Sequence, residues 1–555
     1  MEKKTVLALV LCFFVLFLWS SLFTPKNGQQ PQNVKESEEE IIQNTAEVSD
    51  VEPPSHKVST RVPEKIPGKT LPEADQTEIE IDTPLYRAVF SNAGPAIKSF
   101  KLKEYRQTID PHSPLIELVN LEQDMGDYFI FSFDENNSAN EEKLIYQVDH
   151  SSIFLENESS PKELTFTSIT ANGLLINQTY RFYPDKYNID LTVNVINQSG
   201  KIIQGSFNTY LNALPPQKKI SYYSFSGFVL LINDDLQEVK IKKASEEKTF
   251  KGQIGWAAYE DAYFISAFSQ KKHSQSTFEG SLLPSGVLHG KHLTPQISIN
   301  PSQQVSSEYT MYLGPRDLGI LKDAGIDLDR AVNFGWTDIL AKPLLYLLRF
   351  FNNFIHNYGV SIIILTIIVK ILFWPLTHKS YKSMKEMQKL QPRMAKIREK
   401  YKDNKEQLNK EMMGLYKTYK VNPMGGCLPM IIQIPVFFAL FRILGSAIEL
   451  RHAPFMLWIQ DLSAPDRLFN FPFHIPFMAP PYGVPVLTLL MGASMFIQQK
   501  MTPSPGDPAQ AKIMMLLPLI FTFMFINFPS GLVLYWLVNN ILSIGQQYRI
   551  HKGQA

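Results

Sequence analysis

Cysteine is scarce in this chain, which contains only two, Cys12 and Cys427, among 555 residues. Both lie in apolar segments far apart in the sequence, so there is no Cys-x-x-Cys metal motif and we expect no disulfide. An excess of charge is also lacking, because 54 Lys and Arg are balanced by 53 Asp and Glu. This balance argues against a protein that binds DNA through overall basicity, so any electrostatic partner must meet a local patch.

Catalytic and metal-binding side chains are missing from the long apolar segments. These segments contain no Asp or Glu and no interior His, and they cover residues 358–377, 424–447, 483–499, 513–528 and 530–547. Ser530 and Gly531 superficially resemble an intramembrane serine nucleophile, but no partner base accompanies them. We therefore expect no enzyme, no metal site and no cofactor.

The first part of the chain predicts an anchor followed by a linker. Residues 1–23 begin with a basic start and continue as an apolar stretch long enough to span a bilayer, without a small-x-small cleavage pattern. An uncleaved transmembrane anchor is the prediction, and a cleaved signal is the alternative. Residues 24–76 are rich in Glu, Gln, Pro and Ser with few aromatics, which predicts a flexible linker.

Residues 77–335 alternate between apolar and polar side chains, most clearly from Tyr187 to Val195. A period of two is typical of strands with one buried face, and turn-forming clusters separate the runs. We predict a large antiparallel β sandwich. No His or carboxylate cluster in it stands out as a site.

From residue 335 onward helical periodicity takes over. Residues 338–357 mix Leu and Phe with Lys and Arg, which predicts an amphipathic helix in the membrane interface, or alternatively a helix packed on the sandwich. The five apolar segments and the anchor give six transmembrane helices. Residues 378–420 hold 13 Lys or Arg against 5 Asp or Glu, while 448–481 hold 2 against 3. The positive-inside rule then places the basic loop and both termini in the cytoplasm and the β domain outside.

A single charge, Lys370, interrupts the apolar segment 358–377 near its centre. Such residues usually face a bundle interior or a wet cavity, although a Lys stem can also snorkel to the interface. Thr366 lies four residues earlier on the same helical face and extends it as a polar stripe. We therefore expect water or a polar partner to contact this face of the helix.

Other polar groups lie in the third and last spans. Gln433 stands between two prolines that free backbone carbonyls, and Tyr535 and Trp536 precede Asn539 and Asn540. These groups either form interhelical hydrogen bonds or share a wet groove with Lys370.

The basic loop 378–420 predicts a helical hairpin, because its apolar residues recur at intervals of three and four on both sides of Asp403. The first helix carries Met384, Met387, Met394, Lys389, Lys396 and Arg398. One possibility is that the apolar seams of the two helices pack against each other. The other is that, beside the dense positive charge, they bind hydrophobic chains, ribosomal RNA or anionic lipid.

Four segments carry a family resemblance: GVSIIILTIIVKILFWPLT (359–377), VNPMGGCLPMIIQIPVFFALF (421–441), ELRHAPFMLWIQDLSAPD (449–466) and FPSGLVLYWLVNN (528–540). Their order and spacing resemble the YidC membrane-protein insertase family, and the anchor and exported domain resemble its Gram-negative form. The resemblance implies a β-supersandwich, a five-helix core beside the anchor, and a hydrophilic groove that works without ATP in the bacterial inner membrane. It also implies nascent integral membrane proteins as clients and, as partners, the ribosome, targeting factors and the Sec translocon.

The resemblance further implies a positive groove residue at the position of Lys370, where Arg is the commoner choice. Lys is a point charge without the planar fork of Arg, so this sequence departs from the family in geometry. Thr366, Gln433, Tyr535 and Trp536 match groove positions that contact the client in relatives. Two alternatives remain open from the residues alone, a small-solute transporter and an envelope sensor that binds through its β domain.

Overall fold

The computed structural model describes residues 76–121, 125–135, 144–157, 159–216, 225–241, 243, 246–419, 421, 428–502 and 508–552. The predicted anchor 1–23 and the linker 24–76, apart from its last residue, lie outside the described residues. All described residues belong to one unit, Glu73–Ala555.

The first part of this unit is a β domain, as the alternating pattern predicts. Its strands are β1 (Glu78–Asp82), β2 (Tyr86–Ser91), β3 (Ala96–Arg106), β4 (Leu115–Glu117), β5 (Phe129–Glu135), β6 (Gln147–Val148), β7 (Ser152–Phe154), β8 (Lys162–Ile169), β9 (Leu174–Phe182), β10 (Asn188–Asn197), β11 (Ile203–Ala213), β12 (Gly227–Ile232), β13 (Asp235–Val239), β14 (Glu247–Glu260), β15 (Phe264–Gln270), β16 (Gln275–Leu282), β17 (Leu288–Leu293), β18 (Ile297–Ile299) and β19 (Gln304–Pro315). In β10 every second residue is buried, which is the period of a strand with one face on a core.

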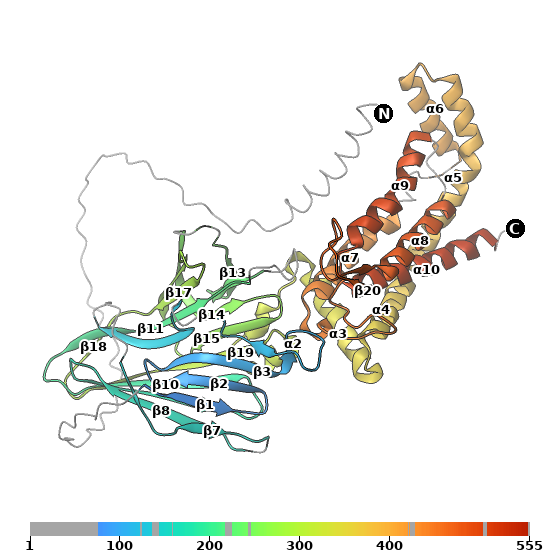
Figure 1. Ribbon diagram of the computed structural model, residues 1–555. Helices are drawn as coiled ribbons and strands as arrows, with labels where there is room; N and C mark the ends of the chain where they lie inside the picture. Colours follow the sequence, from blue (N-terminus) through green and yellow to red (C-terminus); the bar gives the residue numbers. More distant parts are fainter. Residues whose placement is uncertain are drawn as a thin grey trace, which may run out of the picture. The chain divides into compact units, whose positions relative to one another are not determined.

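The strands form two sheets (Figure 1). The smaller has the order β4-β3-β2-β1-β7. The larger has fourteen strands, of which eleven follow one path from β18 to β6, while β5, β12 and β13 pair beside that path. Among the described strands only β1 and β7 pair in parallel. The core between them is rich in aromatic side chains, and Trp256, Tyr86, Tyr180 and Phe90 are fully buried. Such large side chains contribute most of the apolar burial in the domain.

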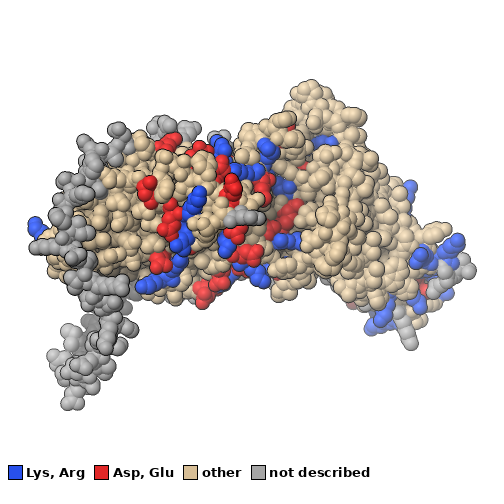
Figure 2. Space-filling view, turned by 90° about the horizontal axis from the view of Figure 1, so that it is seen from below, with Lys and Arg blue, Asp and Glu red and all other residues tan. Residues whose placement is uncertain are grey.

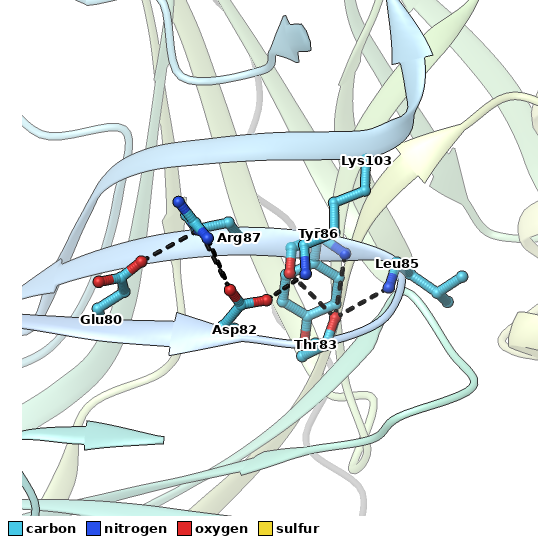
Figure 3. Close-up of polar contacts among 7 residues, drawn as sticks. All are labelled: Glu80, Asp82, Thr83, Leu85, Tyr86, Arg87 and Lys103. Carbon is cyan, nitrogen blue, oxygen red and sulfur yellow. Dashed lines mark hydrogen bonds and ion pairs between the residues drawn. The ribbon is translucent and has the colours of Figure 1, made fainter. Parts of the chain in front are cut away.

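The turn between β1 and β2 shows how local chemistry fixes a hairpin (Figure 3). The Thr83 hydroxyl accepts a hydrogen bond from the backbone N–H of Tyr86 at 3.0 Å and donates to the Tyr86 carbonyl at 3.1 Å. Asp82 pairs with Arg87 at 2.9 Å and with Lys103 of β3. Burial alone would raise the pKa of Asp82, but these hydrogen bonds and charges lower it overall.

The second part of the unit is helical. Its helices are α2 (Leu318–Ala324), α3 (Asp338–Ile355), α4 (Tyr358–Leu372), α5 (Trp374–Lys400), α6 (Lys405–Thr418), α7 (Leu428–Ser446), α8 (Val486–Met501), α9 (Pro508–Phe525) and α10 (Ser530–Lys552). A short hairpin of β20 (Leu468–Phe471) and β21 (Tyr482–Val484) lies between α7 and α8. The prediction of a large β domain followed by a helical region is confirmed.

Helix α3 contacts α4 and α7 through a narrow buried stripe that includes Leu345 and Leu348. Its other faces expose large apolar side chains, with Ile339, Phe350 and Phe354 between 54% and 86% exposed. The apolar surface of α3 is therefore only partly used in packing.

Among the described helices, none is on its own both long and apolar enough to cross a membrane. Helices α4 and α5 meet the requirement only together, and they are bent by 65° at Phe373. Pro375 explains the break, because it lacks the N–H that would bond the carbonyl one turn earlier. Two shorter apolar helical stretches cover Gln433–Ser446 and Met514–Phe525.

Candidate functional site

Helix α4 presents Lys370 to the interior of the helical region. The Asn357 side chain caps the helix by accepting a hydrogen bond from the Val360 N–H at 3.0 Å. The buried face of α4 then carries Ile362, Leu365, Thr366 and Lys370 at helical intervals, whereas the opposite face is exposed. Lys370 is 7% exposed, so its ammonium lies among helices and does not reach outward along its stem.

The partners of Lys370 are neutral. Its Nζ donates to the Ser543 hydroxyl at 2.6 Å and lies 3.4 Å from Asn539 Oδ1, both on α10. No carboxylate of the described residues lies within ion-pair distance of this ammonium. Burying a cation beside neutral partners alone costs free energy, and such a cation still attracts any anion that can reach it.

A polar row on α10 continues from this contact. Asn539, Ser543 and Gln546 follow each other at intervals of four and three, and Gln546 exchanges hydrogen bonds with Thr377 at 2.9 and 3.2 Å. Sequence reasoning named Asn539 but missed Ser543 and Gln546. The spacing of the three side chains was a visible signal, since such intervals share one helical face.

Gln433 of α7 completes a small recess beside Lys370. Gln433 Nε2 donates to the Tyr535 hydroxyl at 3.3 Å, which joins α7 to α10. The recess is lined by Val369, Lys370, Phe373, Leu376, Thr377, Gln433 and Asn539. Its volume of about 20 Å³ is enough for about one water. The structure therefore brings Lys370, Gln433, Asn539 and Tyr535 together.

Two predicted groove residues have other surroundings. The Thr366 hydroxyl donates to the carbonyl of Ile362 on its own helix at 2.6 Å, and its side chain is buried. Trp536 packs at 4.5 Å from the ring of Phe437 and at 5.2 Å from that of Phe525. Neither residue lines the recess.

Helices α5 and α6 form the predicted hairpin, with Met394 and Leu390 buried and Met384 and Met387 half-buried. The seam is thus largely occupied by packing within the protein, while Lys389 and Lys396 are exposed. Arg398 is half-buried. Many of the exposed hairpin residues are therefore basic, although Glu399 and Met413 are exposed as well.

An ionic cluster joins the β domain to the helices on the far side from the hairpin. Arg349 of α3 lies 3.2 Å from Asp317 and 3.5 Å from Glu449. Burial, and then the neighbouring Asp317, raise the pKa of Glu449 to about 7. Arg451 continues the junction by donating to the Arg106 carbonyl of β3 at 2.7 Å.

Chemically, the recess presents one cation, the Lys370 ammonium, together with groups that accept and donate hydrogen bonds, and it has room for a water. Among the described residues it offers no nucleophile with a base.

Two family models match this chain. Residues 78–347 match the YidC periplasmic domain, and residues 350–555 match the 60Kd inner membrane protein.

Curated relatives are similar over the whole length. The chain is 44% identical over 560 residues to the membrane protein insertase YidC of Syntrophus aciditrophicus, with 100% of each covered. It is 41% identical over 558 residues to that of Geobacter metallireducens, covering 100% of this chain and 99% of the relative. A solved active YidC insertase with its first transmembrane domain resolved covers 86% of this chain and 93% of its own at 18% identity, with a TM-score of 0.37, too low to establish a shared arrangement.

Proposed function

This chain belongs to the YidC family of membrane protein insertases, and we propose that the recess around Lys370 is where it receives the polar part of a nascent membrane protein. The family function is non-enzymatic insertion into the inner membrane, and nascent membrane proteins are its substrates. This function takes the place of the transporter and sensor alternatives that the residues left open.

The observation that carries the proposal is the unpaired charge. Lys370 is buried, yet its two contacts are a hydroxyl and an amide oxygen. An approaching carboxylate would supply the missing counter-charge in surroundings of low dielectric, where attraction is strong. Lys370 is thus the group that attracts an acidic extracytoplasmic tail part-way across.

The client segment places its polar flank against the opening of the recess while its apolar face slides against α7 and α10. Gln433, Asn539 and Tyr535 exchange hydrogen bonds with that flank, which lowers the desolvation barrier. The membrane potential adds about 2.3 kcal/mol per charge per 100 mV to the outward movement of an acidic tail. Partition of the apolar segment into lipid supplies the net driving force.

The proposed topology has six transmembrane helices: the anchor 1–23 and the segments 358–377, 424–447, 483–499, 513–528 and 530–547. Both termini lie in the cytoplasm. Figure 2 shows two charged regions on one face of the molecule, one with mixed charges and one with mainly basic residues. The wide surface between them is almost free of charge, as expected of a part that lies in the membrane, and this supports the topology. Helix α8 has 16 residues and is about 24 Å long, which supports a locally thinned bilayer.

The exposed basic surface of the hairpin supports docking of the ribosome and targeting factors, with anionic lipid as a further partner. In this proposal Lys389, Lys396 and Arg398 make the contacts, and the methionines stabilise the hairpin from within. The core works alone or beside the Sec translocon.

Site-specific photocrosslinking to a stalled nascent membrane protein tests the recess. A photoreactive residue at Gln433 or Asn539 is expected to crosslink the client. The matched control is Ile371, which follows Lys370 directly but is 64% exposed on the opposite face. Equal crosslinking from position 371 and from the recess would contradict the assignment.

A further inference from the structure

The loop between α7 and α8 has an unusual composition for an exposed segment. Residues 468–484 (LFNFPFHIPFMAPPYGV) contain no Lys, Arg, Asp or Glu, and they include five Phe or Tyr and four Pro. Surface loops are normally polar, and a contiguous apolar patch marks an interaction surface. This segment includes the β20–β21 hairpin and is called the apolar loop below.

The apolar loop turns its aromatic side chains outward. Phe469, Phe473 and Phe477 are 69%, 60% and 79% exposed. Phe469 and Phe477 also have φ of 59° and 64°, a left-handed conformation that is rare for bulky residues. Strain of this kind persists where the surrounding structure imposes it and is concentrated at functional sites. The outward position of these rings is therefore built into the backbone.

Neighbouring polar side chains bond several backbone groups of the apolar loop. Arg467, at its base, donates to the carbonyls of Pro481 at 2.8 Å and Ala479 at 3.3 Å. Asn527, at the end of α9, accepts from the Ala479 N–H at 2.7 Å and donates to the Phe477 carbonyl at 2.8 Å. The four prolines remove further N–H donors. These contacts reduce the number of backbone groups that would lack a partner in a medium without water.

The exposed rings continue the apolar surface of the neighbouring helices. The ring of Phe477 lies 5.6 Å from that of Phe523 on α9, which is 55% exposed. Leu519 on the same helix is 66% exposed, and Leu489 of α8, close to the loop, is 51% exposed. In an inner-membrane protein, exposed apolar faces of this kind meet acyl chains. The apolar loop is contiguous with that lipid-facing surface.

The apolar loop lies on the side of the β domain. Arg451, in the same α7–α8 connection, donates to the Arg106 carbonyl of β3. Residues 78–347 match the YidC periplasmic domain, so this side is periplasmic. We propose that residues 468–484 insert into the acyl-chain region of the periplasmic leaflet beside α8 and α9, with Phe469, Phe473 and Phe477 in contact with lipid.

Fluorescence quenching in proteoliposomes tests the insertion. Full-length protein with Cys12 and Cys427 replaced by Ser receives one new cysteine, Phe473→Cys or Phe477→Cys, which is labelled with an environment-sensitive dye. The vesicles contain phosphatidylethanolamine, phosphatidylglycerol and a phospholipid with a doxyl group on its acyl chain. The matched control is Ile202→Cys, because Ile202 is 62% exposed but belongs to the β domain.

Insertion predicts that the dye at 473 and 477 loses most of its intensity to the doxyl lipid, emits at shorter wavelength and resists iodide, whereas the dye at 202 responds only to iodide. Quenching by iodide at 473 would overturn the proposal. Protection from both quenchers would overturn it as well, because a protein surface would then cover the loop. Phe473 is not in the left-handed region, so Phe473→Cys remains informative if Phe477→Cys folds poorly. The measurement is independent of insertion activity, so its failure leaves the Lys370 mechanism untouched.

Discussion

Replacement of Lys370 by Met should impair insertion only for clients that carry an acidic residue in the translocated tail. The recess has room for about one water, and a client carboxylate bridged to the ammonium by that water would lie two hydrogen-bond lengths, about 6 Å, from it. At an effective dielectric constant near 20, two unit charges at that distance attract by about 3 kcal/mol. Because 1.4 kcal/mol corresponds to a factor of ten, Lys370→Met should slow such a client by about 100-fold.

The assay is protease protection of newly inserted clients in vesicles that contain the variant as the only insertase. Two clients are compared that differ in a single tail residue, Asp or Asn. A potential of 100 mV contributes about 2.3 kcal/mol per charge, comparable to the attraction by Lys370, so vesicles without a potential give the cleaner measurement.

Two further variants sharpen this test. Lys370→Glu reverses the attraction and should block the Asp client, while Lys370→Arg keeps the charge and should retain the preference. Lys382→Met removes an exposed hairpin charge and serves as the control. If the Asp and Asn clients are slowed equally by Lys370→Met, the electrostatic role is wrong, and Lys370 only maintains the packing of the helices.

Three further predictions concern stability. Ser543→Ala removes the nearest partner of the buried ammonium and should lower the free energy of unfolding by about 1.5 to 3 kcal/mol. The variant should melt at a lower temperature in detergent, and Ser543→Thr should restore the melting temperature. Burial raises the pKa of Glu260 to about 7, although the neighbouring Arg316 acts in the opposite direction. The folded state therefore binds this proton more tightly, and stability of the β domain should fall as pH rises from about 4.5 to 7, a slope that Glu260→Gln should reduce. Gly359→Ala should destabilise by about 1 to 3 kcal/mol, because a Cβ there overlaps an aromatic ring, whereas Gly414→Ala has free space and should gain about 1 kcal/mol.

Most of the fold class could be predicted from the sequence, because periodicity reports which face of an element is buried. The alternation in β10 and the apolar seam around Met394 are both visible in one dimension. The pairing of the strands could not be predicted. Strand β10 pairs with its neighbour β9 on one side and on the other with β19, which lies more than 100 residues further along the chain. Such contacts depend on tertiary packing and not on local propensity.

The candidate site was predictable in part. A lone lysine in an apolar segment is conspicuous, and polar residues in other helices are natural partners. Ser543 was missed because a serine in a helix usually bonds its own backbone, as this one also does by donating to the Asn539 carbonyl at 2.7 Å. Trp536 and Tyr535 are adjacent in sequence but lie about 100° apart around the helix, so Tyr535 bonds Gln433 of the recess while Trp536 packs against Phe437.

The bend between α4 and α5 leaves a single residue, Phe373, between the lysine-bearing helix and the hairpin. Helix α5 has 27 residues and is about 40 Å long, and the bend at its start lies three residues from Lys370. Its first turn carries Leu376 and Thr377, which line the recess together with Phe373 at the bend. The helix that forms one side of the hairpin is thus also part of the wall of the recess.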